Sequence, residues 1–360
     1  MKKTAKFILI LGLSLVFLKG CAPKFKPKLI PRTQPLWLGL HVLIENKPSA
    51  EALLSELPAL AAAGINLLIF EIDYNYKYVS HPELRGEDPI SRETVKKVVK
   101  FCRNHKIRLI PEFQSLGHQS WAEKTFPLLT KHPEFDETPG QFPENKDIYC
   151  RSWCPLHPDV NPIIFALFDE LIEVFEADAV HVGMDEVFLI GSEYCTRCRG
   201  KDPAELFAKS VNDYHQHLVK NRGVEMLMWG DRLLDGEITG YGEWEASLNG
   251  TYPAIDLIPK DIIICDWHYE RMKSYPSIPI FLNKGFRVLP TSFKDPKQTK
   301  KLIDFSLAFP SERMLGHLCT IWKAPEEGKT SHWPPLLAAA KKLRKMGFLN
   351  EPLPGKRDKE

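Results

Sequence analysis

The 360-residue sequence has almost no surplus charge, because 48 Lys and Arg against 46 Asp and Glu give a formal net charge of +2. So small a surplus argues against nucleic acid as the main partner. The sequence also contains no His-Glu-x-x-His motif or similar cluster, which argues against a catalytic metal. No Gly-rich phosphate loop follows the first predicted strand, and this weakens the case for an open, doubly wound nucleotide-binding sheet.

Long apolar runs are missing apart from one near the start. The run Phe7 to Phe17 is apolar or small throughout, yet it is shorter than the roughly 20 residues that a membrane-spanning helix needs. Three Lys lie within the first six residues, ahead of this run. A basic start followed by a short apolar run is typical of a signal peptide, and we assign residues 1–20 to one.

The segment after the apolar run indicates where the protein goes. Leu18-Lys19-Gly20-Cys21 resembles the lipobox of bacterial lipoproteins, in which the Cys becomes the lipidated first residue. We therefore expect a protein exported in a bacterium and anchored through Cys21 to the cell envelope, in the periplasm or at the outer membrane. The anchor would be its only contact with the membrane. Residues 21–35 are rich in Pro and Lys and predict a semi-rigid tether.

From residue 36 onward, strand-like and helix-like patterns alternate. Eight such strands with helices between them predict an α/β fold, a single (β/α)₈ TIM barrel over residues 36–350, followed by a charged tail at 351–360. The helix patterns are weak at 231–259, which is rich in Gly and turn residues. The predicted strands are 37–42, 66–72, 107–113, 178–184, 224–230, 261–267, 286–291 and 317–322, and the clearest helices are 49–63, 91–105, 160–176, 202–221, 296–308 and 332–346.

Polar and aromatic residues collect where the predicted strands end. Active sites of such barrels lie at the carboxyl ends of the strands, so these residues are expected to meet. The clearest case is the fourth strand, on which Val180, Val182 and Met184 face one way and the chain then runs into Asp185 and Glu186. Other strand ends carry Asp73, Glu112, His118, Trp229, Asp231, Trp267, Tyr269 and Trp322.

Carboxylates grouped with Trp and Tyr are typical of a carbohydrate pocket. Aromatic faces pack on the apolar faces of sugar rings, while acids and His hydrogen-bond the hydroxyl groups. Core packing is the alternative for each Trp, and we favour it for Trp37 and Trp333. For Trp229, Trp267 and Trp322 the position at a strand end favours the pocket.

The order of these motifs resembles glycoside hydrolase family 20, the β-N-acetylhexosaminidases. The run from His181 to Glu186 looks like the His-x-Gly-x-Asp-Glu signature of that family, and Pro111 to His118 resembles its third-strand motif, which ends in Gly-His. Cys154 to Pro158 and Trp229-Gly230-Asp231 also occupy family-like positions. The similarity covers residues 36–345 and is nearest to short members of the hexosaminidase D type, which lack the small α/β domain that usually precedes the barrel.

This resemblance implies a retaining, exo-acting enzyme that removes terminal β-linked N-acetylhexosamine, either GlcNAc or GalNAc. In that family the 2-acetamido oxygen of the substrate attacks the anomeric carbon and forms an oxazolinium intermediate. Glu186 would protonate the leaving oxygen and later activate water, and Asp185 would orient the acetamido group. Tyr269 would bind the acetamido carbonyl. Further substrate contacts are assigned to His118, His181, Trp229, Asp231, Trp267, Trp322, Glu112 and Asp73.

The sequence departs from the family pattern at two strand ends. Members commonly carry an Arg near the end of the first strand, whereas this segment reads Leu38-Gly39-Leu40-His41-Val42. Asp73, Glu71 or Asp231 are the candidates to replace its contacts. The Trp-x-Glu often found at the last strand is Trp322-Lys323-Ala324 here, which leaves Glu326 or Glu327 to take that role.

Four of the eight cysteines form two closely spaced pairs in the loops on either side of the fourth strand, Cys150-x-x-x-Cys154 and Cys195-x-x-Cys198. In an exported protein we expect such pairs to form disulfides. A structural four-Cys zinc site is the second hypothesis, and unpaired thiols are the third. Either bonded form would hold the loops near the acids, and no other cofactor is expected.

The sequence therefore predicts a β-N-acetylhexosaminidase acting on N-acetylhexosamine-containing glycans. A non-catalytic barrel lipoprotein that binds amino-sugar glycans is the main alternative, since the first-strand Arg is absent. A chitinase-like barrel is disfavoured because its Asp-x-x-Asp-x-Asp-x-Glu strand is missing. A purely structural lipoprotein would leave the strand-end aromatic residues unexplained.

Overall fold

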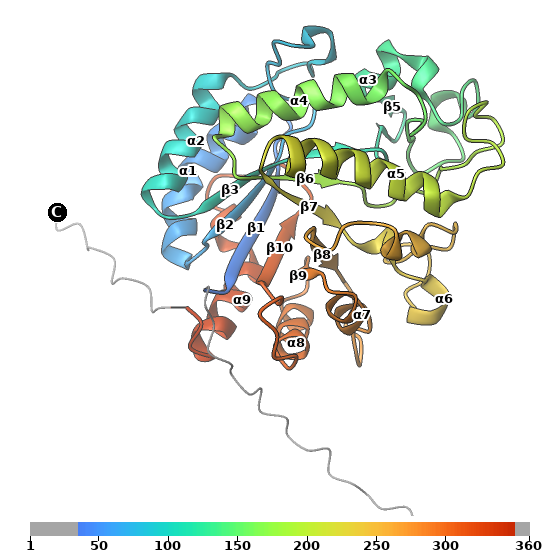
Figure 1. Cartoon of the computed structure of the whole chain (residues 1–360). Helices are drawn as coiled ribbons and strands as arrows, with labels where there is room; N and C mark the ends of the chain where they lie inside the picture. Colours follow the sequence, from blue (N-terminus) through green and yellow to red (C-terminus); the bar gives the residue numbers. More distant parts are fainter. Residues whose placement is uncertain (1–34, 350–360) are drawn as a thin grey trace, which may run out of the picture.

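Eight parallel strands close into a barrel in the computed structural model of the chain, which describes residues 35–349 (Figure 1). The expected signal peptide, Cys21, most of the tether and the charged tail lie outside these residues. The order around the barrel is β1-β10-β9-β8-β7-β6-β3-β2. The strands are β1 (Trp37–Leu43), β2 (Leu67–Glu71), β3 (Arg108–Ser115), β6 (Ala179–Gly183), β7 (Glu225–Trp229), β8 (Ile263–Trp267), β9 (Arg287–Ser292) and β10 (Gly316–Ile321).

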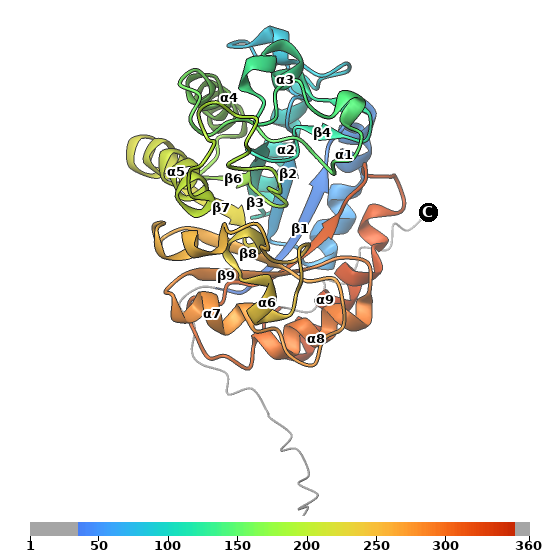
Figure 2. The same cartoon turned by 90° about the vertical axis from the view of Figure 1, so that its right-hand side faces the viewer.

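Helices surround the strands, as Figures 1 and 2 show from two sides, and the predicted TIM barrel is confirmed. A two-stranded antiparallel sheet, β4 (Ser120–Trp121) with β5 (Lys124–Thr125), is inserted after β3. The helices are α1 (Lys47–Ala63), α2 (Arg92–Asn104), α3 (Pro127–Lys131), α4 (Val160–Phe175), α5 (Pro203–His215), α6 (Gly236–Thr239), α7 (Ser277–Asn283), α8 (Pro296–Ser306) and α9 (Pro334–Lys345).

Local sequence signals account for several helix limits. The Ser91 side chain accepts the N–H of Thr94 at the start of α2, and the Asp202 carboxylate accepts the N–H of Ala204 at the start of α5, which also has Pro203 at its first position. The predicted helix 202–221 is α5 continued by a π-helical turn over Gln216–Asn221. The weak region 231–259 contains only the four-residue α6 and short 3₁₀ turns.

Side chains alternate between two cores, as expected for strands that are buried on both faces. Residues such as Val180, Val182 and Met184 pack outward against the helices. A smaller cluster that includes Ile69, Ile110 and Trp229 fills the barrel interior. Polar residues replace aliphatic ones toward the carboxyl ends of the inward-facing rows, which is where the strand pattern predicts the site.

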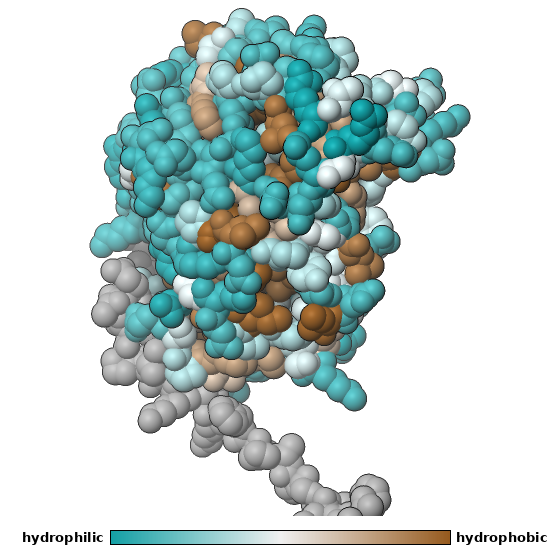
Figure 3. All heavy atoms as spheres, turned by 45° about the vertical axis from the view of Figure 1, so that its right-hand side comes forward, coloured by the Kyte–Doolittle hydropathy of each residue, from teal (hydrophilic) through white to brown (hydrophobic). Residues whose placement is uncertain are grey.

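The barrel is closed by the pairing of β1 with β10, in which Trp37 lies opposite Gly316. A Cβ at Gly316 would lie 2.1 Å from the carbonyl oxygen of Trp37, so only glycine allows this approach. The surface turned to the viewer in Figure 3 is mostly hydrophilic, with separate apolar patches. Within residues 35–349, no helix has both the length and the apolar character needed to cross a membrane.

Candidate active site

The two acids predicted on the fourth strand lie together at the end of β6. The Asp185 side chain is 9% exposed and the Glu186 side chain 13% exposed. Nε2 of His118, from the loop after β3, is 3.1 Å from a carboxylate oxygen of Glu186 and 3.5 Å from one of Asp185. The predicted grouping of these three residues is therefore present in the structure, and all three reach solvent.

The charge on His118 is controlled by its acidic neighbours. Burial disfavours the charged imidazole, yet its acidic neighbours, Asp185 above all, together outweigh burial and hold the pKa of His118 well above its ordinary value. A protonated His118 can donate a hydrogen bond toward either acid. The imidazole is thus placed to offset the repulsion between two adjacent carboxylates.

Gln114, which was not among the site residues predicted from the sequence, holds Asp185 in place. Its side-chain N–H donates to the Asp185 carboxylate, and its side-chain oxygen accepts the N–H of Met184 at 3.1 Å. The N–H of Gln114 donates in turn to the carboxylate of Asp73 at 2.7 Å. Asp73 therefore acts on the acids through Gln114, and burial raises the pKa of Asp73 well above its ordinary value.

The backbone around the acids is strained. His118, Met184 and Glu186 have φ values of +50°, +73° and +49°, which side chains other than glycine rarely adopt. Such conformations cost of the order of 1–3 kcal/mol each and are characteristic of functional sites. Despite these turns, a carboxylate oxygen of Asp185 and one of Glu186 lie within 4.8 Å of each other, on either side of His118.

Gly183 is required by this arrangement, and we expect Gly183→Ala to damage both stability and activity. Its φ is +66°, and an added Cβ would lie 1.4 Å from the side-chain oxygen of Gln114. We expect a loss of about 1–3 kcal/mol in the free energy of unfolding, measured with urea, and a large fall in kcat/KM. Gly200→Ala is the matched control, because its φ is +74° and nothing lies within 4 Å of the new Cβ. Equal effects of the two substitutions would contradict this explanation.

Asp231, at the end of β7, holds Glu186 from the other side. Its carboxylate accepts the N–H of Glu186 at 2.9 Å and the indole N–H of Trp267 at 3.3 Å. Nε of Arg232 donates to the same carboxylate at 2.7 Å. Burial raises the pKa of Asp231 to about 6, against the opposing effect of Arg232. Since Asp231 is 3% exposed, it positions Glu186 rather than lining an open pocket.

One side of the candidate site is aromatic and consists of Trp267, Tyr269 and Trp322. The rings of Trp267 and Tyr269 are 4.8 Å apart, and the indole N–H of Trp322 donates to the Tyr269 hydroxyl at 2.6 Å. Burial, with a smaller contribution from both acids, raises the pKa of Tyr269 well above its ordinary value. The phenol therefore stays protonated and keeps a hydrogen to donate.

Glu112, His181 and Trp229 lie beneath the acids and are fully buried. The indole N–H of Trp229 donates to Glu112 at 2.9 Å, and Nδ1 of His181 is 3.1 Å from the same carboxylate oxygen. Burial favours the neutral acid, but His181 and His41 outweigh it and hold the pKa of Glu112 at about 2. These three residues, predicted as substrate contacts, form the floor that supports the site.

His41 occupies the segment where an Arg was expected. Its Nε2 is 2.8 Å from Glu71 and 3.2 Å from Glu112, and the ring is fully buried. Burial opposes protonation, but the two carboxylates raise the pKa of His41 to about 10. His41 thus supplies a positive charge under the site and is itself fully buried. Glu326, which with Glu327 was a candidate for the Glu of the last-strand Trp-x-Glu pattern, is held between Lys323 and Lys329 on the surface.

His268 connects Tyr269 to the loop after β7. Its Nδ1 lies 2.7 Å from Glu245, whose other carboxylate oxygen accepts the N–H of Tyr269, and its Nε2 lies 3.1 Å from Asp266. Burial opposes protonation, but Asp266 and Glu245 raise the pKa of His268 to about 9.

This histidine predicts a pH-dependent stability. Because the folded state binds the proton more tightly, its contribution is complete below pH 6.5, decreases between pH 6.5 and 9, and is absent above. We expect the stability difference between wild type and His268→Gln to shrink by up to about 3 kcal/mol across that window, measured by urea unfolding. His105→Gln, at the exposed end of α2, should follow the wild type. An unchanged difference for His268→Gln would disprove the assignment.

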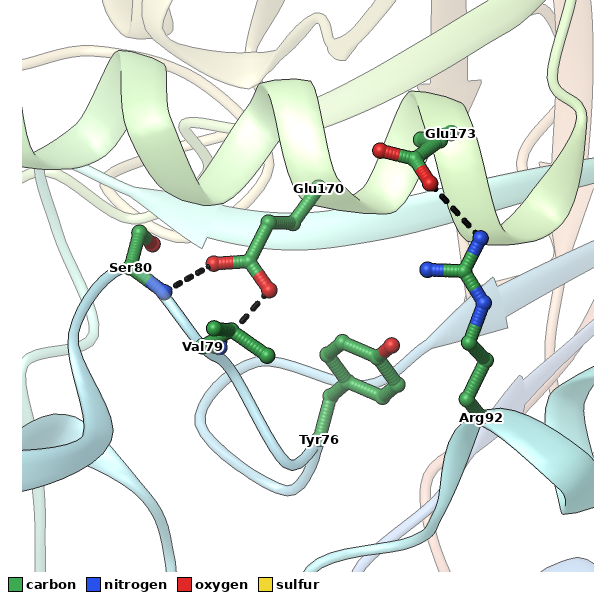
Figure 4. Close-up of a pocket in the computed structure, with 6 residues that line it drawn as sticks. All are labelled: Tyr76, Val79, Ser80, Arg92, Glu170 and Glu173. Carbon is green, nitrogen blue, oxygen red and sulfur yellow. Dashed lines mark hydrogen bonds and ion pairs between the residues drawn. The ribbon is translucent and has the colours of Figure 1, made fainter.

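A hollow on the flank of the barrel lies between the loop after β2 and α4 (Figure 4). Its lining includes none of the predicted site residues. The carboxylate of Glu170 accepts the backbone N–H groups of Val79 and Ser80, and Arg92 pairs with Glu173 at 2.6 Å. These contacts fasten the loop that carries Asp73 to α4, so we assign the hollow a structural role.

The four cysteines predicted as two pairs are divided differently in the structure. Cys154, Cys195 and Cys198 lie together with the buried Glu137, whereas the thiol of Cys150 faces the carbonyl oxygen of Glu186 at 3.7 Å. The four-Cys grouping is therefore wrong as to Cys150. All seven cysteines in the described part of the chain have free thiols.

Comparison with known proteins supports what this geometry indicates. The model of "Glycosyl hydrolase family 20, catalytic domain" matches residues 54–294, more than half of the chain. A beta-hexosaminidase of Emericella nidulans is 24% identical over 282 residues, which are 68% of this chain and 40% of that protein. The beta-hexosaminidase subunit beta of Homo sapiens is 30% identical over 149 residues, which are 38% of this chain and 25% of that one. The chain thus spans less than half the length of these curated relatives.

Solved structures share the fold. The Flavobacterium johnsoniae chitobiase has a TM-score of 0.65 at 21% identity, with 86% of this chain and 48% of that chain covered. Dispersin B has a TM-score of 0.55 at 16% identity, with 86% of this chain and 99% of that chain covered.

A (β/α)₈ barrel with paired acids at one strand end, together with this match, places the chain in a family of glycoside hydrolases. The chain belongs to glycosyl hydrolase family 20, as its ordered strand-end motifs predicted.

Proposed function

We propose that the protein removes terminal β-linked N-acetylhexosamine from glycans by substrate-assisted catalysis. The observation that carries this proposal is that the neighbouring carboxylates of Asp185 and Glu186 have different partners. The Asp185 carboxylate accepts the side-chain N–H of Gln114, whereas the Glu186 carboxylate lies 3.1 Å from Nε2 of His118 and is 13% exposed. An acid held by an amide can position an internal nucleophile, and an acid that reaches solvent can transfer a proton.

In the first step Glu186 gives its proton to the glycosidic oxygen while the acetamido oxygen bonds to the anomeric carbon. The glycosidic bond breaks, and the leaving sugar carries away the proton. Asp185 accepts a hydrogen bond from the acetamido N–H and stabilises the positive charge of the oxazolinium ring. In the second step the Glu186 carboxylate takes a proton from water, which opens the ring with overall retention at the anomeric carbon.

Aromatic residues at the rim favour a leaving group that is itself a sugar. Tyr149 lies 5.7 Å from the His118 ring and contacts Trp121, Phe188 and Trp244 at ring distances of 5.1–5.6 Å. Trp121 is 56% exposed and Trp244 47% exposed. Exposed rings next to the proton donor offer flat apolar faces to the next sugar of the chain.

The direct test is hydrolysis of nitrophenyl β-N-acetylglucosaminide and β-N-acetylgalactosaminide by protein lacking residues 1–20. We expect turnover of at least one of them and no turnover of the matching glucoside, because the glucoside lacks the acetamido nucleophile. Efficient cleavage of the glucoside would rule out substrate assistance. Absence of turnover of all three between pH 4 and 8 would favour the glycan-binding alternative.

Export and lipid attachment at Cys21 are proposed on the sequence alone. Wild-type protein should fractionate with bacterial membranes and be released by mild detergent, whereas Cys21→Ser should appear in the soluble fraction. Equal membrane association of the two proteins would refute the anchor.

A further inference from the structure

A buried group of three thiols and one carboxylate joins two loops beside the acids. Glu137 and Cys154 belong to the loop after β3, and Cys195 and Cys198 belong to the loop after β6. All four residues are buried. Each offers one donor atom, and the four donor atoms lie within 4.8 Å of one another.

The distances between the sulfur atoms fit a shared cation better than a covalent bond. Sγ of Cys154 is 3.3 Å from Sγ of Cys198 and 3.4 Å from Sγ of Cys195. Thiolates around one tetrahedral zinc ion, each about 2.3 Å from the metal, lie about 3.8 Å apart. A disulfide needs about 2.05 Å and can join only two of the three sulfurs. The Cys195-x-x-Cys198 spacing is itself typical of zinc sites.

Glu137 provides an independent observation. One of its carboxylate oxygens accepts the N–H of Ser192 at 2.8 Å, while the other is buried and makes no close hydrogen bond, and the neighbouring side chains of the carboxylate are the thiols of Cys195 and Cys198. Thiols are weak donors, so a buried carboxylate beside them is costly unless a cation binds it. Since this side chain belongs to the thiol cluster, one metal ion would satisfy the carboxylate and all three sulfurs together.

We propose that Glu137, Cys154, Cys195 and Cys198 bind one structural zinc ion. Four protein ligands leave no open position, so the ion takes no part in catalysis. Its role is to join the loop that carries His118 and Tyr149 to the loop that follows Glu186. The site is independent of the reaction assigned to the protein, because its existence is read from metal content.

The test is the metal content of the full chain, extracted in mild detergent and purified without chelator or reductant. We expect about one zinc per chain by elemental analysis, and every thiol except a lipid-bound Cys21 should react with a thiol reagent after denaturation. Protein without zinc, or with two thiols fewer, overturns the proposal, and the second result identifies a disulfide.

Single substitutions test which residues bind the zinc ion. Glu137→Gln preserves the shape of the side chain, and we expect at least a tenfold weaker hold on zinc in competition with a coloured chelator. Cys198→Ser should purify with less than half the zinc of the wild type. Cys150→Ser is the matched control and should keep its zinc, because this thiol lies outside the cluster. Loss of zinc from Cys150→Ser alone would refute the ligand set.

Discussion

Glu186→Gln should lower kcat for an unactivated N-acetylhexosamine disaccharide by about 10²–10⁴-fold, because the amide cannot protonate the leaving oxygen. A nitrophenyl glycoside needs little protonation of its leaving group, so its first step should be affected much less. The fold should be preserved, since Asp231 accepts the backbone N–H of Glu186 and that group is unchanged. Initial rates on both substrates provide the measurement.

The control is Glu173→Gln, which alters an exposed carboxylate on α4 and should leave both rates unchanged. Equal losses on the disaccharide and the nitrophenyl glycoside would show that Glu186 is not the proton donor.

Arg232→Met should cost about 3–5 kcal/mol of stability, which is the largest structural effect that we predict. Arg232 is fully buried, pairs with Asp231 at 2.7 Å, and donates to the carbonyl oxygens of Trp244 and Ala246. Its loss leaves a buried carboxylate unpaired and frees the loop that carries Glu245. Activity should fall as well, because Asp231 positions Glu186.

Urea unfolding followed by tryptophan fluorescence measures this loss. Arg222→Met provides the comparison, since Arg222 forms a half-exposed pair with Asp169 and should cost less than about 1 kcal/mol. A result for Arg232→Met within 1 kcal/mol of that control would contradict the role given to the buried pair.

The barrel could be predicted from sequence because its strands are buried on both faces and read as short, nearly continuous apolar runs. All eight predicted strands agree with the structure to within two residues at each end. The region 231–259 gave no clear helix because its contacts are specific ones, such as Arg232 with backbone carbonyls, and such contacts leave no periodic pattern.

The acids were predictable because both directly follow one strand, and adjacency in sequence keeps them together in space. Gln114 and Tyr149 could not be predicted from the sequence, because their contacts with Asp185 and His118 depend on how separate segments fold together around the acids. Glu137 gives no signal in the sequence, because it is one of three acids within residues 134–137, in a loop 17 residues before Cys154. The spacing of Cys150 and Cys154 misled because sequence spacing does not show where a thiol points: the thiol of Cys150 faces the carbonyl oxygen of Glu186, whereas that of Cys154 joins Cys195 and Cys198.

The pairing of β1 with β10 also places the first and last described strands side by side, so that both ends of the described chain can be located relative to the acids. The first described strand starts at the amino end of the barrel, and the guanidinium of Arg344, near the end of α9, donates to the carbonyl of Ala63 at that same end. Both ends of the described chain therefore leave from the face opposite the acids. If the protein is attached to a membrane through either end, the face that carries Asp185 and Glu186 points away from that membrane. Large glycans could then reach the acids without passing between the protein and the membrane.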